Sequence, residues 1–320
     1  MPPAQDDVTI MNLEFKITKH LEKLAQKSNA IRRQFYPSKE EEKFEGKSVD
    51  PLKEEKRAPI KGLIHRYSNR VLILLTLNCA AYCRFCFRRR LVSDIGKSFL
   101  IDKDLNNIIS YIKKHPQINE VIISGGDPLT VPFLLEKFLR KITKLEQIKI
   151  IRIGSRLPTS DPKKIDKNIL RILKLVKKQP LYLLLHFEHP DELTKETKIA
   201  LKKLRATGAI LLSQSVFLKG INDNVNVLEK LFTELLSLGV KPYYIFHNDE
   251  PLGTSHFTVD FKKEIKIMTE LRERLSGLAC PMYVYDEPNS KCKIPIPLDF
   301  DYSFMKRNSI NKKSKVKSGI

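Results

Sequence analysis

The stretch NCAAYCRFCFRRR, residues 78–90, decides the fold because it gathers three of the chain's five cysteines in one short run. Cys79, Cys83 and Cys86 have the spacing C-x3-C-x2-C directly after an apolar segment. Three thiolates at this spacing can hold three irons of a cubane 4Fe-4S cluster, which leaves the fourth iron open to another ligand. Structural zinc usually takes paired C-x2-C units with further ligands, and the sequence has no second pair. The run therefore predicts an iron–sulfur cluster, with a zinc site or three unrelated thiols as the alternatives.

After residue 70, short apolar segments alternate with amphipathic patterns at helical spacing. The apolar segments are 71–78, 121–124, 148–154, 181–187, 209–216, 240–246 and 281–286. The helical patterns between them cover 102–115, 133–145, 167–178, 194–207, 225–238 and 261–275. This alternation predicts a parallel sheet with right-handed crossovers, either doubly wound or rolled into a barrel. We expect an α/β fold of the barrel or partial-barrel type.

Polar residues stand where the predicted strands end, and functional groups gather at this edge of a barrel. In strand order these residues are the three cysteines, Gly125 to Asp127, Ser155 and Arg156, His186, Gln214, His247 and Asp249, and Asp286. The segment SGGDP is weak evidence alone, because Gly-Gly-Asp is commonly an ordinary turn. Its glycines would let a backbone approach a ligand, and its carboxylate could pair with an ammonium. We expect these residues to share one site.

Two regions flank the predicted barrel, which covers residues 59–300. Residues 8–35 carry apolar positions at helical spacing, and Pro37 and a charged run through Arg57 interrupt them. Residues 1–58 are therefore expected to form a helical extension and a charged connector. Residues 301–320 concentrate lysine in a Ser/Asn-rich setting, which predicts a basic, disordered tail.

The composition is typical of a soluble protein with a large core. The chain has 320 residues, and 42% of them are hydrophobic, which suits one α/β barrel or two smaller domains. No apolar run approaches the roughly 18 residues of a membrane helix, and the first residues, MPPAQDD, have neither the basic region nor the apolar region of a signal peptide. Cys280 and Cys292 lie far from the cysteine run, which argues against a secreted disulfide framework. An oxygen-sensitive cluster also needs a reducing compartment, so we expect a cytoplasmic protein.

The charge balance raises the question of a nucleic-acid or acidic protein partner. Lys and Arg number 58 against 37 Asp and Glu, a formal net charge of +21. The lysines are spread over nearly every helical segment, and no RNP, KH or helix-turn-helix signature accompanies them. The charge therefore indicates solvated helix faces. A cluster-bearing RNA-binding or RNA-modifying protein stays the alternative from a different class.

Segments of the chain, taken in order, resemble the lysine 2,3-aminomutase family of radical S-adenosylmethionine (SAM) enzymes. They are RVLILLTLNCAAYCRFCFRRR, SGGDP, RIGSRLP, HFEHPDELT, QSVFLKGIND, PYYIFHND and LGTSHF, with DPLKEE and GLIHRYSNRV before them. The likeness runs from about residue 32 to residue 297. It implies a radical SAM partial barrel with a 4Fe-4S cluster, SAM on the open iron, pyridoxal 5′-phosphate (PLP), and L-lysine as the substrate.

The resemblance also implies which residues bind the cofactors. Those assigned to SAM are Gly125, Gly126, Asp127 and Gln214. Those assigned to PLP are Arg66, Tyr67, Arg70 and Lys293. Guanidinium groups suit the phosphate as planar multi-donor cations, and the lysine would bind PLP covalently. The family has a Gly-rich segment before this lysine, whereas residues 289–292 here are Asn, Ser, Lys and Cys, which leaves Lys291 as a competitor.

Three residues match the family's substrate contacts. Arg88 would hold the substrate carboxylate, although an arginine in an RRR run can equally contact phosphate or solvent. Asp249 and Asp286 match two carboxylates that bind the distal ammonium of lysine. Two buried acids at one site are costly unless a cation lies between them. The pair therefore favours lysine over glutamate, with an aminomutase for another amino acid as the nearest alternative.

The family implies a reaction and a set of partners. SAM is cleaved reductively to a 5′-deoxyadenosyl radical, and the amino group of lysine moves from C2 to C3. The chain lacks the family's carboxyl-terminal extension, and Asn224 stands where a zinc-ligating cysteine is expected, so no structural zinc is expected. Short homologues of this kind resemble the EpmB branch, which makes (R)-β-lysine for elongation factor P and its lysyl ligase. A flavodoxin or ferredoxin would reduce the cluster.

Overall fold

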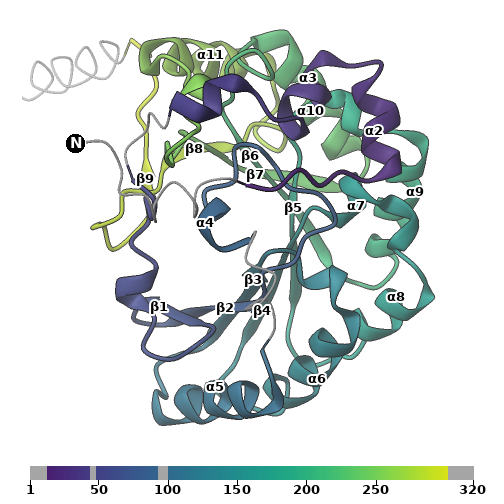
Figure 1. Ribbon diagram of the computed structural model, residues 1–320, viewed down its shortest axis with the longest axis vertical. Coiled ribbons are helices and arrows are strands. Elements are labelled where there is room, and N and C mark those ends of the chain that lie inside the picture. The colour runs from purple at the N-terminus through teal and green to yellow at the C-terminus, as the bar shows by residue number, and fades with distance from the viewer. Residues whose placement is uncertain (1–12, 44–47, 93–99, 302–320) are drawn as a thin grey trace, which may run out of the picture.

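The computed structural model describes residues 13–43, 48–92 and 100–301. Its centre is a nine-stranded sheet whose strands follow the order of the chain. The strands β2 to β8 run parallel to one another, as the sequence predicts. Their bounds are β2 Arg70–Thr76, β3 Glu120–Gly125, β4 Ile150–Ser155, β5 Leu181–His186, β6 Ile210–Val216, β7 Val240–Phe246 and β8 Met282–Tyr285. Within the described residues β2 and β8 do not pair, which confirms a partial barrel (Figure 1).

Helices cover the outer face of this curved sheet (Figure 1). They are α5 Asp102–Lys114, α6 Pro132–Ile142, α7 Leu157–Ser160, α8 Lys167–Leu173, α9 Lys195–Arg205, α10 Val225–Ser237 and α11 Phe261–Arg274. In α10 the buried residues Leu228, Leu231, Phe232 and Leu235 recur every three or four positions, the spacing of an amphipathic helix. None of the helices in the described ranges has the length and apolar character needed to cross a membrane.

Alternate residues of each strand face the helices and the interior of the barrel, because successive side chains of a strand point to opposite faces. In β2, Val71, Ile73 and Leu75 are buried in the main hydrophobic core, whereas Leu72 lines the interior cavity. In β4, Arg152 lines the same cavity between buried neighbours. The pleat thus separates the core from the site.

Two short strands that the sequence analysis did not predict extend the sheet at its edges. β1, Leu63–Tyr67, pairs antiparallel with β2, and β9, Ile294–Pro295, pairs antiparallel with β8. Two residues are too few for a periodic pattern, so β9 leaves no signal in the sequence. The ion pair between Arg66 Nη1 and Asp286 Oδ1, at 2.6 Å, joins β1 to the loop that follows β8.

The amino-terminal extension forms short elements rather than one long helix. α2 is Lys19–Ala25, α3 is Asn29–Phe35, and the 3₁₀ helices η1 Lys39–Lys43 and η2 Glu55–Arg57 follow. The hydroxyl of Thr18 caps α2 by accepting from the backbone N–H of Leu21, and Ser28 caps α3 in the same way. α2 and α3 bury apolar residues against Ala81 of the cysteine loop. Residues 1–12 and the predicted tail from 302 lie outside the described residues.

The connector is tied to the cysteine loop by buried ion pairs, which the sequence analysis did not foresee. Glu41 pairs with Arg84 at 2.6 Å and with Arg89 at 2.8 Å, and all three side chains are buried. Glu54 pairs with Arg88 at 2.7 Å. Asp50 and Glu55 pair with Arg90 of the short helix α4, Arg89–Val92. The arginines of the RRR run therefore face protein carboxylates rather than solvent.

We expect Glu41→Gln to lower the free energy of unfolding by about 3 kcal/mol, because it leaves two buried guanidiniums short of a counter-charge. Burial raises the pKa of Glu41, but hydrogen bonds from Arg84 and Arg89 outweigh it, and the pKa lies below its ordinary value. The matched control is Glu42→Gln, an exposed neighbour, which should change stability by less than about 0.5 kcal/mol. Urea denaturation measures both, and equal midpoints would refute the structural role of Glu41.

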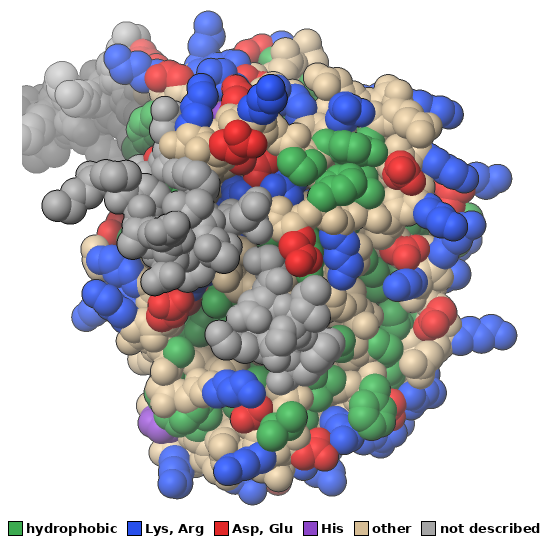
Figure 2. Space-filling view, viewed as in Figure 1, with side chains coloured by type: hydrophobic (Ala, Val, Ile, Leu, Met, Phe, Trp, Pro, Cys, Tyr) green, Lys and Arg blue, Asp and Glu red, His purple; other side chains and the backbone are tan. Residues whose placement is uncertain are grey.

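The surface charge is dispersed on the face shown in Figure 2. Lysine and arginine side chains are spread over this face, with acidic side chains between them (Figure 2). Several cations of the protein surface are engaged in ion pairs, such as Arg171 with Glu136 at 2.5 Å and Lys263 with Asp223 at 2.6 Å. This distribution agrees with solvated helix faces and lends no support to the RNA-binding alternative.

Candidate active site

A cavity of about 610 Å³ occupies the interior of the partial barrel. Every residue to which the resemblance assigns a cofactor or substrate role lines it, whereas His247, which was expected at the same edge, does not: its Nδ1 lies 2.8 Å from Glu264 Oε2. The residues with these roles are Arg66, Tyr67, Arg70, Cys79, Cys83, Cys86, Arg88, Gly125, Gly126, Asp127, Gln214, Asp249, Asp286 and Lys293. The fold therefore brings together residues that are spread over more than two hundred positions of the chain.

The three cysteines lie on the loop that follows β2, and burial raises the pKa of each thiol above its ordinary value. For Cys86 the pKa rises to about 11. Within the described ranges, no three His, Cys, Asp or Glu side chains lie close enough together to hold a single metal ion. A cubane cluster is larger than one ion and holds its cysteine sulfurs farther apart. Three cysteine sulfurs from one loop are the ligand set that a cubane cluster with one open iron requires.

The Gly-Gly-Asp segment packs against the cysteine loop. Gly125 has a φ of +113°, and a Cβ there would lie 2.2 Å from the carbonyl oxygen of Thr76. A Cβ on Gly126 would lie 2.3 Å from the carbonyl oxygen of Asn78. The backbone N–H of Asp127 donates to that same oxygen at 2.8 Å. Both glycines are thus required because two protein loops approach each other closely here. The sequence analysis had instead expected them to let the backbone approach a ligand.

The Asp127 carboxylate is already bound by protein donors. It accepts hydrogen bonds from Ser155 Oγ at 2.9 Å, from the backbone N–H of Arg156 at 2.8 Å and from that of Leu129 at 3.0 Å. These contacts tie the loop after β3 to the end of β4. The side chain therefore has less capacity to pair with an ammonium than the sequence suggested.

The loop after β8 turns back through β9 and places Lys293 beside Asp286. The Lys293 ammonium donates to Asp286 Oδ2 and lies 4.8 Å from the centre of the Phe246 ring. Lys291 is exposed and does not line the cavity. No residue from 287 to 293 has a positive φ. Asn289 and Ser290 can therefore replace the family's glycines without backbone strain.

Arg66, Tyr67 and Arg70 come from β1 and the start of β2, where Tyr67 is the register partner of Arg70. The Tyr67 ring centre lies 3.8 Å from the Arg70 guanidinium carbon and 5.1 Å from that of Arg66. The Tyr67 hydroxyl and Arg66 Nε are buried and have no hydrogen-bond partner in the described part of the chain. Buried donors without partners are costly. This corner of the cavity is therefore suited to a polar, anionic ligand.

Asp249 presents an unpaired carboxylate to the same cavity. Its Oδ1 is buried and has no hydrogen-bond partner among the described residues. Burial, and then the charge of Asp286, raise the pKa of Asp249 to about 7. The next residue, Glu250, has a φ of +50°, a conformation that non-glycine residues seldom adopt. A cation bound beside Asp249 would relieve this electrostatic cost.

Comparisons with known proteins identify the family to which these residues belong. The Radical SAM superfamily model matches residues 73–231. An L-lysine 2,3-aminomutase of Buchnera aphidicola is 38% identical over 251 residues, which cover 78% of this chain and 73% of that protein. The chain belongs to the L-lysine 2,3-aminomutase family. The L-lysine 2,3-aminomutase of Fusobacterium nucleatum is 40% identical over 268 residues, or 83% of this chain. This chain spans 62% of that protein's length.

A solved structure supports the fold alone. A radical SAM methyltransferase from Sphaerobacter thermophilus superposes with a TM-score of 0.51 at 14% sequence identity. The match covers 70% of this chain and 68% of that protein.

The L-lysine 2,3-aminomutase family implies a 4Fe-4S cluster, SAM and PLP, and the cavity has groups for each. Three partly buried cysteines line it from one loop, as a cluster with one open iron requires. A lysine also lines the cavity, with two arginines and a tyrosine whose buried hydroxyl has no hydrogen-bond partner among the described residues. The residues of this aminomutase-family chain therefore fit all three groups.

Arg88, the residue assigned to the substrate carboxylate, is held by a protein carboxylate. Its Nε and Nη2 donate to the two oxygens of Glu54 at 2.9 and 2.7 Å. Its Nη1 donates to Ser124 Oγ at 3.3 Å and to the carbonyl oxygen of Gly125 at 3.4 Å. Nη1 is thus the group of Arg88 that a substrate carboxylate can reach without displacing Glu54.

Several cavity residues carry no assigned role in the sequence analysis. His186, Arg152, Arg156, Tyr243 and Tyr244 all line the cavity. A β-bulge between β6 and β7 turns two consecutive tyrosines inward, and Tyr243 donates from its hydroxyl to that of Tyr244 at 3.0 Å. Strand alternation would place neighbours on opposite faces. The sequence analysis expected His186 and Arg156 at this site, since each ends a predicted strand, and both line the cavity.

Proposed function

We propose that the protein is a PLP-dependent radical SAM enzyme that converts L-lysine to β-lysine, an isomerase of the lysine 2,3-aminomutase type. The observation that carries the proposal is the Asp249 carboxylate, which lines the cavity near Asp286 and whose Oδ1 has no hydrogen-bond partner among the described residues. A second carboxylate close by makes a cationic ligand more favourable still. The distal ammonium of lysine is such a cation, and it arrives on a flexible chain of suitable length.

The chain's own residues bind, orient and enclose the reactants. When bound, the cluster, SAM and PLP supply the radical chemistry and the electron sink. Cys79, Cys83 and Cys86 hold the cluster, and Lys293 binds PLP. The rest of the cavity orients the ligands, with Arg66, Tyr67 and Arg70 at the PLP phosphate, Gly125 to Asp127 and Gln214 at SAM, and Arg88, Asp249 and Asp286 at lysine.

Enclosure is the second contribution of the protein. The barrel wall around the cavity is apolar at Leu72, Ile122, Leu184 and Phe246. These side chains limit the entry of water and lower the local dielectric, which strengthens each ionic contact to the substrate. Positioning lysine by both its carboxylate and its distal ammonium fixes C3 relative to the cofactors.

A comparison of substrates tests the role of the distal ammonium. L-Norleucine has the same carbon chain as lysine without the ammonium, so its kcat/KM should be at least about 100-fold lower. L-Glutamate, which places a like charge near Asp249 and Asp286, should show no turnover. Amino-group migration on each is followed by chiral chromatography under anaerobic conditions. Turnover of norleucine or glutamate at the rate of lysine would favour an aminomutase for another amino acid.

We further propose that the β-lysine serves elongation factor P, onto which a lysyl ligase would attach it, and that a flavodoxin or ferredoxin reduces the cluster. What supports this is the likeness to the EpmB branch. In addition, Asn224 caps α10 by accepting from the backbone N–H of Asn226 at 2.9 Å, and is thus a helix cap where the longer enzymes have a zinc ligand. Mass spectrometry of elongation factor P from cells with and without the gene tests this use.

A further inference from the structure

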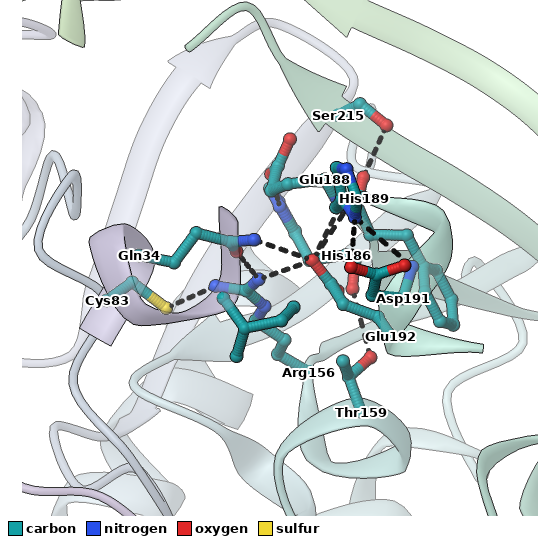
Figure 3. A network of polar contacts seen from close by, with 12 residues as sticks. Gln34, Cys83, Arg156, Thr159, His186, Glu188, His189, Asp191, Glu192 and Ser215 are labelled. Carbon is teal, nitrogen blue, oxygen red and sulfur yellow. Dashed lines mark hydrogen bonds and ion pairs between the residues drawn. The ribbon is translucent and has the colours of Figure 1, made fainter. Parts of the chain in front are cut away.

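We propose that Arg156 is a positioning residue that raises the reduction potential of the cluster through Cys83, an inference that rests on the proposed cluster site. Arg156 Nη1 donates to Cys83 Sγ at 2.8 Å (Figure 3). Arg156 follows β4 whereas Cys83 follows β2, so the contact crosses the mouth of the barrel. Among the described residues, no arginine side chain donates a hydrogen bond to Cys79 or Cys86, although the charges of Arg88 and Arg89 also act on Cys86. Arg156 would therefore act on the cluster through the sulfur of Cys83, one of its three cysteine ligands.

Both terminal nitrogens of the Arg156 guanidinium are held by hydrogen bonds. Its Nη2 donates to Gln34 Oε1 and, at 3.2 Å, to Glu192 Oε1 (Figure 3). Its carbon lies 4.8 Å from the ring centre of Phe35 and 5.3 Å from that of Phe85. Aromatic faces on a cation and a carboxylate at its edge leave it one main orientation. That orientation points Nη1 at the sulfur.

Glu192, the counter-charge of this arginine, is itself held rigidly. Its side chain is fully buried. Its Oε1 accepts from the backbone N–H groups of Glu188 and His189 at 3.1 Å and from Gln34 Nε2 at 3.0 Å. Gln34 belongs to α3 of the amino-terminal extension. The extension is therefore linked to Cys83 by one relay of hydrogen-bonded side chains, from Gln34 through Arg156 to Cys83.

The physical effect follows from the charge of the reduced cluster. When the oxidised cluster takes one electron from a one-electron reductant, negative charge builds up on its sulfurs. A cationic N–H donor at Cys83 stabilises that added charge, and hydrogen bonds to cluster sulfurs are a known determinant of the potential. No bond breaks at Arg156, and no proton moves. The arginine thus favours reduction, the step that must precede cleavage of SAM.

The test is a redox titration of the reconstituted full-length protein without SAM, PLP or lysine, with the reduced cluster followed by electron paramagnetic resonance. Arg156→Gln should shift the reduction equilibrium at least tenfold toward the oxidised cluster, about 59 mV for one electron. Arg156→Lys, which keeps the charge but loses the fork of donors, should shift it less. The control is Arg171→Gln, whose arginine pairs with Glu136 on the surface and should leave the potential unchanged.

An unchanged potential in Arg156→Gln, at the iron content of the unmodified protein, would overturn the proposal. If that variant takes up no iron, Gln34→Leu carries the test, because it leaves Arg156 in place while removing one of its acceptors. This variant should shift the potential in the same direction by a smaller amount. A potential equal to that of the unmodified protein would overturn the role of the relay. Failure of the unmodified protein to bind a cluster would instead refute the proposed function, so the two failures are distinguishable.

Discussion

Lys293→Ala is expected to lose covalently bound PLP and to lower lysine turnover by at least about 10³-fold, because no other described lysine lines the cavity. The Lys293 ammonium lies against Asp286 and the Phe246 ring, inside the site. Lys291 is two residues away and exposed. The absorbance of protein-bound PLP after desalting reports the covalent link, and chromatography of β-lysine reports turnover.

Lys291→Ala is the matched control, since it removes the competing lysine from the same loop. It should keep both the PLP absorbance and at least half of the turnover. Reduction with borohydride followed by peptide mapping locates the modified lysine directly. PLP that stays bound to Lys293→Ala, with the label found on Lys291, would contradict the assignment.

Asp249→Asn is expected to have two effects of opposite sign. It should lower kcat/KM for lysine about 100- to 1000-fold, because the distal ammonium loses a buried counter-charge. It should also stabilise the ligand-free protein at pH 8 by about 2 kcal/mol, since the native carboxylate is charged, buried and unpaired. Lysine titrations of the activity and urea denaturation of the ligand-free protein measure the two effects.

The pH dependence of this stabilisation has a definite sign. Burial, then Asp286, raise the pKa of Asp249 to about 7, while Lys293 and His247 act in the opposite direction. The folded state therefore holds a proton that the unfolded state releases near its ordinary pKa of about 4. The cost of the charge grows as the pH rises from about 4 to 7 and is complete above 7. The gain from Asp249→Asn should thus be larger at pH 8 than at pH 5.

The control for this prediction is Asp299→Asn, an exposed carboxylate, which should change neither stability nor turnover. Asp286→Asn is a poorer test of the ammonium site. Asp286 pairs with Arg66 and Lys293, so its removal disturbs those groups as well. A loss of stability in Asp249→Asn at pH 8 would show that its carboxylate has a partner in solution and would remove the main support for the ammonium site.

The sequence could predict the parallel strands and the members of the cavity, because both follow from local patterns. Apolar segments such as 71–78 predict buried strands. In a parallel sheet, polar residues that follow successive strands must lie at the same edge. Asp249 and Asp286 are an example, since each follows its own strand, β7 or β8. Their lining of one cavity is a consequence of topology rather than of any single motif.

The buried ion pairs and hydrogen bonds of the connector and extension could not be predicted, because they join residues without a periodic relation. Glu41 meets Arg84 across 43 positions, and Gln34 meets Arg156 across 122. A charged connector and a run of arginines each suggest solvent exposure when taken separately. Their burial against each other depends on how the extension crosses the cysteine loop. Likewise, β9 forms only because the chain turns back after Asp286. A strand of two residues is too short to show a pattern that predicts it.

The central claim, that the protein moves the amino group of L-lysine from C2 to C3, is tested most directly by one anaerobic assay. The full-length protein is reconstituted with iron and sulfide, supplied with PLP, SAM, dithionite and L-lysine, and the products are separated by chiral chromatography. We predict β-lysine that depends on each addition and is absent with Lys293→Ala. Cleavage of SAM to 5′-deoxyadenosine without β-lysine, in a fully loaded protein, would contradict the assignment of lysine as the substrate.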